Sequence, residues 1–233
     1  MKAGRHGWFF TGMAIAVVAT VVAGFTPTYY LKPLFATPAL PLSLHIHGAL
    51  FTAWVLLFAA QTSLVAANRT DLHRRLGMAG AALAVAMVVS GTAVAIESAR
   101  LGRPALGVLA QASPLFVLVI PLGSVVVFAI LVGLGLYYRR QPQAHKRLML
   151  LATVALLPPA LGRMRMLNAL GPQAFFGVTV VFIVVVVAYD YWTRRRVHAV
   201  SLWAGLFLAL SFPGRIALGH TAAWLTFARW LAR

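Results

Sequence analysis

The sequence predicts an all-α integral membrane protein, a bundle of seven transmembrane helices. Three observations lead to this fold class. Apolar residues make up 61% of the 233 positions and charged residues only 10%, whereas soluble domains carry about 25% charged residues. Seven apolar runs follow one another, each long enough to cross a bilayer, for which about 20 residues suffice. Basic residues gather in every second loop. This composition excludes a soluble globular domain and a disordered chain.

The seven runs are separated by short loops that are basic or rich in Pro and Gly. We expect helices at about 8–30, 43–67, 76–97, 114–138, 148–168, 174–192 and 199–219. The first run is longer than the apolar core of a signal peptide, and Gly24-Phe25-Thr26-Pro27 is a poor cleavage site, so this helix is expected to be retained. Prolines inside later runs predict kinks at Pro121, at Pro158 and Pro159, and at Pro213.

The tail after the last run, residues 221–233, predicts a short helix lying in the membrane interface. Its large apolar side chains fall near one helical face, with two arginines beside them: Trp224, Phe227, Trp230 and Leu231, then Arg229 and Arg233. The chain is therefore expected to be one transmembrane domain, residues 1–233, that ends in this tail helix.

The basic residues predict the orientation in the membrane. Twelve of the twenty Lys and Arg residues precede the first run or lie in the loops after the second, fourth and sixth: Lys2, Arg5, Arg69, Arg74, Arg75, Arg139, Arg140, Lys146, Arg147, Arg194, Arg195 and Arg196. The opposite loops contain only Lys32, Arg100 and Arg103. The positive-inside rule then places the N-terminus in the cytoplasm. The net charge of +17 predicts contact with anionic headgroups, and not nucleic-acid binding.

Histidines recur at the starts of alternate runs. The second run is followed by Leu72-His73-Arg74-Arg75-Leu76-Gly77 and the fourth by Ala144-His145-Lys146-Arg147-Leu148-Met149, while a weaker copy surrounds His198. Two interpretations are open. The imidazoles cap helices and anchor basic loops among lipid phosphates. Alternatively, His73, His145 and His198 converge on a divalent metal or a haem, since imidazole suits zinc, copper and iron.

A second group of polar residues is expected at the opposite, outer end of the bundle. Arg163 follows His145 by 18 residues, and Arg215 follows His198 by 17, which is roughly 25 Å along a helix. The expected members are His45, His47, Glu97, Arg163, Arg165, Asn168, Arg215 and His220. Gln61, in the second run, is a further polar group that needs a partner inside the membrane.

This outer group also has two interpretations. The arginines extend to the headgroups and one of them pairs with Glu97, or the group forms a pocket for an anion with histidines as ligands or proton carriers. Haem b suits the second interpretation because it needs axial histidines, for which His47 and His220 are the first candidates, and basic groups for its propionates. The expected cofactor contacts are His45, His47, His220, Arg163, Arg165 and Arg215. A lipid headgroup or a quinone is equally compatible.

Several chemistries are excluded by residues that the chain lacks. It has no Cys, which excludes thiolate metal sites, and only three acidic residues, too few for paired-carboxylate hydrolysis. Phosphate-binding Gly-rich loops, His-Glu-x-x-His and Gly-x-Ser-x-Gly are also missing. Whether the protein is an enzyme is left open.

Several of these motifs together resemble a family of uncharacterised bacterial multi-pass inner-membrane proteins. The matching segments are His45–Trp54 (HIHGALFTAW), Gln61, Leu72–Gly77, Ala144–Leu151, Ala188-Tyr189-Asp190 and Arg196-Val197-His198. More distantly, the chain is similar to membrane families of unknown function linked to haem–copper oxidase assembly. The resemblance implies a bacterial inner-membrane protein with a role in handling haem or metal.

Three functional hypotheses follow. The leading one is a small inner-membrane protein that binds haem or a metal ion and serves electron transfer or oxidase assembly. The second is a non-catalytic, lipid-binding accessory subunit of a larger membrane complex. The third is a transporter or quinone-binding protein that uses the outer arginines and histidines on an anionic ligand.

Overall fold

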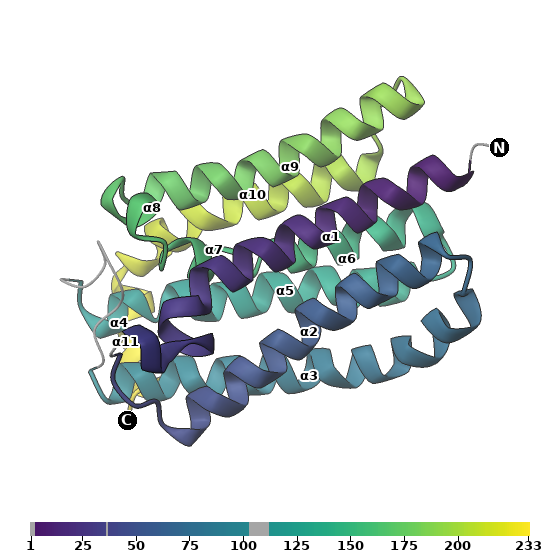
Figure 1. The fold of residues 1–233 in the computed structure, drawn as a ribbon. Helices are drawn as coiled ribbons and strands as arrows, with labels where there is room; N and C mark the ends of the chain where they lie inside the picture. Colours follow the sequence, from purple (N-terminus) through teal and green to yellow (C-terminus); the bar gives the residue numbers. More distant parts are fainter. Residues whose placement is uncertain (1–2, 36, 103–111) are drawn as a thin grey trace.

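Long apolar runs form helices here because hydrocarbon offers the backbone no hydrogen-bond partners, and a helix satisfies its own amides and carbonyls. The computed structural model describes residues 3–35, 37–102 and 112–233, and across these ranges the chain forms helices and no strand. The helices lie side by side along one direction (Figure 1). Lys2 and Arg103, two of the charges used to predict orientation, lie outside the described residues.

Within the described ranges, six helices are long and apolar enough to cross a membrane. They are α1 (Ala3–Phe25, continued by η1, Thr26–Tyr30), α2 (Leu42–Ala66), α3 (Thr70–Arg100), α4 with α5 (Pro114–Val117 and Val119–Tyr137), α9 (Pro172–Arg194) and α10 (Ala199–Gly219). Six of the predicted runs are thus confirmed as helices. The sequence-based start at residue 76 was too late, because α3 already includes the Leu72–Gly77 motif.

The fifth predicted run is broken, so the expectation of a continuous helix over 148–168 was wrong. This part of the chain forms α6 (Pro142–Val154), α7 (Pro158–Leu161) and α8 (Arg165–Ala169). Pro158 and Pro159 supply no backbone N–H, so the carbonyls one turn earlier lose their normal donors. The helix tightens before them, where Leu157 N donates to Val154 O at 3.0 Å.

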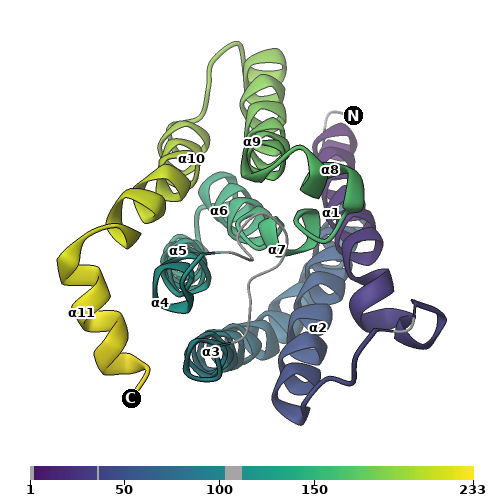
Figure 2. The same ribbon diagram turned by 90° about the vertical axis from the view of Figure 1, so that its left-hand side faces the viewer.

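The broken segment occupies the centre of the bundle. Figure 2 shows α6 and α7 surrounded by α1, α2, α5, α9 and α10, and Figure 1 shows the segment from α6 to α8 running from one end of the bundle to the other. Leu150, Leu151 and Leu157 are fully buried. Irregular backbone is tolerated at this depth because protein, and not lipid, surrounds it.

The two ends of the bundle differ in charge. The basic end carries the loops at residues 67–69, 138–141 and 195–198, and the opposite end carries the loop that follows η1, with η2 (Lys32–Phe35), and the tail helix α11 (Ala222–Leu231). In α11, Trp224 Nε1 donates to Leu115 O at 2.9 Å and Ala228 is fully buried, whereas Phe227 and Trp230 are exposed. The tail helix therefore packs one face on α4.

Candidate functional site

Two of the predicted metal-binding histidines lie together at the basic end. His73 is in the first turn of α3 and His145 is in the first turn of α6. Their ring centroids are 6.1 Å apart and the ring planes are nearly perpendicular, at 82°. A metal ion sits about 2.0–2.1 Å from each imidazole nitrogen that binds it, so a centroid separation of this size is compatible with two rings that bind one ion.

The hydrogen bonds around the pair determine which atoms are available. His145 Nδ1 donates to the carbonyl of Gly135 at 2.8 Å, so Nε2 of this ring carries the lone pair. Gln61 Nε2 donates to His73 O at 3.1 Å. His73 Nδ1 and Gln61 Oε1 are buried and have no hydrogen-bond partner among the described residues. Buried polar atoms are normally satisfied, so these two atoms are available to a ligand.

His198, the third predicted ligand, has a different role. It is the N-cap of α10, where its Nδ1 accepts a hydrogen bond from Val200 N at 3.2 Å. Burial and, next in size, the nearby charge of Arg147 hold the pKa of His198 below its ordinary value of 6.5. Across the described ranges no three His, Cys, Asp or Glu side chains form a group that could hold a metal. The structure thus supplies a histidine pair with Gln61 beside it.

A buried ion pair, which was not predicted from the sequence, lies next to this end. Arg147 of α6 and Asp190 of α9 are 1% and 0% exposed, and Arg147 Nε is 3.1 and 3.0 Å from the two carboxylate oxygens. Ser201 of α10 donates to Asp190 Oδ2, and Arg147 Nη1 donates to the side-chain oxygen of Gln143 at 2.9 Å. Arg147, which the sequence analysis counted among the loop charges, therefore lies buried within α6. The available signal was Asp190, an acid inside an apolar run.

At the opposite end, His47 and Arg163 come together. The His47 ring lies 4.2 Å from the ring of Phe51, and its Nδ1 is buried with no hydrogen-bond partner in the described structure. Arg163 is close enough to act electrostatically on His47. It donates from Nη1 to Pro159 O at 2.6 Å and lies over the ring of Phe25 at 4.4 Å. Its guanidinium thus satisfies a carbonyl of α7.

Arg215 is placed separately, between α10 and α5. It is only 8% exposed, and its Nη1 donates to Ile120 O at 3.0 Å and to Ser124 Oγ. Its side chain also lies directly against Gly123, where a Cβ would overlap it. In the structure this arginine does not extend towards the headgroups. It satisfies polar atoms of α5.

The remaining outer residues differ in exposure. His45, Arg165 and His220 are exposed, while Glu97 and Asn168 are half-buried. The His220 ring packs on Phe116 at 4.6 Å, so His47 and His220 have different aromatic neighbours. Figure 2 shows α2, which carries His47, separated from the α10–α11 junction by α3 and α5. The outer end is thus a set of separate local contacts around His47 and Arg215.

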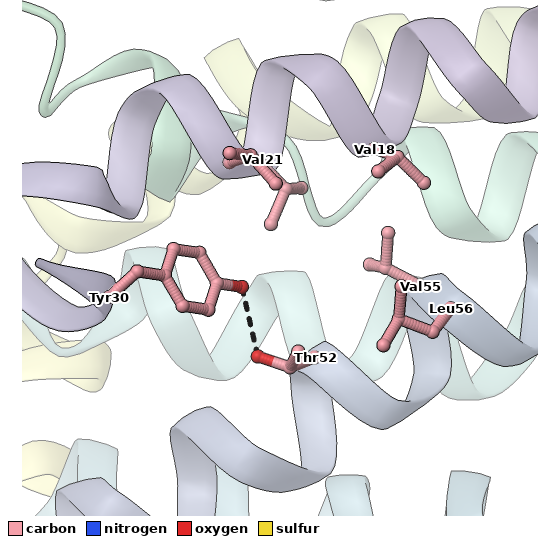
Figure 3. A pocket seen from close by; sticks show the side chains of 7 residues that line it. Val18, Val21, Tyr30, Thr52, Val55 and Leu56 are labelled. Carbon is pink, nitrogen blue, oxygen red and sulfur yellow. Dashed lines mark hydrogen bonds between the residues drawn. The ribbon is translucent and has the colours of Figure 1, made fainter.

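A small cavity of about 120 Å³ lies between α1 and α2 (Figure 3). Its wall consists of Val18, Val21, Val22, Val55 and Leu56, with Tyr30 and Thr52 at one side. The hydroxyls of the last two are hydrogen-bonded at 2.9 Å. Thr52 already donates to Gly48 O at 2.7 Å, so Tyr30 is the donor between them. No histidine lines this cavity.

No protein family, curated protein or solved structure compared with the chain matches it.

Proposed function

We propose that this chain is a seven-span membrane protein, with its N-terminus in the cytoplasm, that binds one transition-metal ion between His73 and His145. The observation that carries the proposal is the histidine pair itself, with ring centroids 6.1 Å apart. The bond to Gly135 O directs the lone pair of His145 to Nε2, and His73 Nδ1 is buried with no described partner. Metal-binding histidines commonly donate their second ring nitrogen to a carbonyl in this way.

The donor set limits the metal. The two imidazoles are borderline ligands that suit copper or zinc, and the amide oxygen, Gln61 Oε1, is a harder ligand beside them. The set carries no negative charge, so it leaves the charge of the ion uncompensated, and this favours monovalent copper over a divalent ion. A redox-active ion at this site would suit electron transfer or delivery of metal to a larger membrane complex. Haem b is not part of the proposal, because His47 and His220 lie apart.

One feature supports the seventh crossing and another supports the orientation in the membrane. The segment from α6 to α8 runs from the basic end to the opposite end at the centre of the bundle (Figures 1 and 2), which makes it the candidate for the seventh crossing. Trp8, Trp192 and Trp203 are 70%, 80% and 67% exposed on α1, α9 and α10. Exposed tryptophans near helix ends are typical of the membrane–water interface, and the basic loops beside them favour the cytoplasmic side.

Metal binding to the purified protein tests the proposed function. Protein in mild detergent is equilibrated with Zn²⁺, with Cu²⁺ and with Cu⁺ under reductant, and bound metal is measured after desalting. We expect one ion per chain, with affinity lowered by at least about 10-fold in His73→Gln and in His145→Gln. His45→Gln and His220→Gln, at exposed histidines, are the matched controls. Equal binding by all four variants would overturn the proposal.

A further inference from the structure

We propose that the basic end also binds the phosphate of an anionic membrane lipid, at a cationic cluster formed by Lys146, Arg147 and Arg194 around Asp190. The cluster lies where the starts of α6 and α10 and the end of α9 meet α1. It uses none of the side chains proposed to bind metal, so this inference goes beyond the proposed function. It shares with that proposal only the placement of the basic end at the cytoplasmic surface.

The charges in the cluster do not balance. Lys146, Arg147, Arg194 and Asp190 all interact electrostatically with His198, so they lie within one small region. Three cations face a single carboxylate. Arg147 is fully engaged, because it bonds to Asp190, to Ser201 and to Gln143. The single carboxylate of Asp190 therefore balances only one of the three cations, and the cluster keeps a net positive charge.

These two cations are held in place and partly desolvated. Lys146 is half-buried, and its Nζ lies 4.6 Å from the centroid of the Phe10 ring of α1. Arg194 Nη1 is buried and has no hydrogen-bond partner within the described ranges. A buried guanidinium nitrogen is costly to leave unsatisfied. An oxyanion placed beside it would receive charge-assisted hydrogen bonds from both side chains.

The surroundings indicate a lipid as the source of this phosphate. The exposed Trp8, Trp192 and Trp203 belong to α1, α9 and α10, three of the helices that form the cluster, and they mark the level of the headgroups. The ring of Tyr189 stacks on Phe9 at 3.7 Å, which adds an apolar wall beside the charges. Basic sites between transmembrane helices at the cytoplasmic face are typical positions for anionic headgroups.

A lipid titration with matched charge changes tests the inference. Protein in detergent is titrated with phosphatidylglycerol and with phosphatidylcholine of the same acyl chains, and bound lipid is counted by native mass spectrometry. We expect the preference for phosphatidylglycerol to fall about 30-fold in Lys146→Gln/Arg194→Gln, since each cation contributes about fivefold. The control, Arg195→Gln/Arg196→Gln, removes two exposed charges and should leave most of the preference intact.

Three outcomes would overturn the inference. An equal loss in both double variants would show a diffuse attraction and no site, and an absence of any preference in the wild type would remove the ligand. Displacement of the lipid by an equal concentration of inorganic phosphate would identify a free anion as the ligand. The single variants Lys146→Gln and Arg194→Gln, each expected to lose about fivefold, keep the test valid if the double variant misfolds. Metal binding should be unchanged in all of them.

Discussion

Arg147 and Asp190 form an ion pair that is almost completely enclosed by protein, with both carboxylate oxygens close to the guanidinium. The pair joins α6 to α9, and Ser201 extends the connection to α10. The central segment loses regular helical hydrogen bonding at Pro158 and Pro159. The ion pair thus fixes its regular half, α6, against two long helices at the basic end.

Removal of the carboxylate should be strongly destabilising. Asp190→Ala leaves the Arg147 charge buried without compensation, and breaking a buried pair costs about 3–5 kcal/mol. We expect a large fall in the thermal unfolding temperature of the detergent-solubilised protein. Arg147→Met/Asp190→Leu, which removes both charges, should recover much of the loss. The exposed pair of Arg69 and Asp71, 3.7 Å apart, provides the control, since Asp71→Ala should cost about 0–1 kcal/mol.

The contact of α1 with the broken segment should depend on Gly24. A Cβ at this position would overlap the carbonyl of Ala160 in α7, a backbone atom that has no freedom to move aside. Gly24→Ala should therefore destabilise the protein by about 1–3 kcal/mol. Gly12→Ala in the same helix, where no atom lies within 4 Å of the added Cβ, should be neutral or slightly stabilising. Similar unfolding temperatures for the two variants would contradict this account of the packing.

The N-cap of α10 should make stability depend on pH. His198 Nδ1 accepts from Val200 N only while the ring is neutral, and the pKa of His198 is held below 6.5. The unfolded chain takes up this proton first as pH falls, so the cap's contribution is complete above pH 6.5 and is lost as pH falls through the folded-state pKa. Between pH 7.5 and 5 the wild type should lose more stability than His198→Asn, whose cap does not titrate.

Site-specific labelling should decide whether the central segment crosses the membrane. The chain contains no Cys, so single cysteines can be introduced without background. Gln141→Cys precedes α6 and Leu170→Cys follows α8, and both positions are exposed. In oriented vesicles an impermeant maleimide should label position 141 only from the cytoplasmic side and position 170 only from the other side. Labelling of both from one side would mean six crossings.

The apolar runs predicted the helices well because hydropathy and length determine where a chain can cross a bilayer. Six runs became helices close to the expected bounds. The break in the fifth run was signalled by Pro158 and Pro159, but its position at the centre of the bundle was not. That position depends on contacts between helices far apart in sequence, which periodicity does not encode.

The candidate site was only partly predictable for a related reason. The repeated motif correctly placed His73 and His145 at helix starts, and the alternating direction of the helices placed both at one end. We did not predict that His198 would be separate from His73 and His145. Its ring is used as an N-cap. Arg147 was grouped with the loop charges because its partner, Asp190, lies 43 residues away. The sequence marks Asp190 as an acid inside an apolar run, but it does not show which cation pairs with it.

X-ray absorption at the edge of the bound metal tests the central claim, the site between His73 and His145, most directly. Protein loaded with one equivalent of copper or zinc should show two imidazole nitrogens at about 2.0–2.1 Å. Both should disappear together in His145→Gln, since loss of one ring opens the pair. A site with fewer than two imidazoles, or a spectrum that His73→Gln and His145→Gln leave unchanged, would contradict the account.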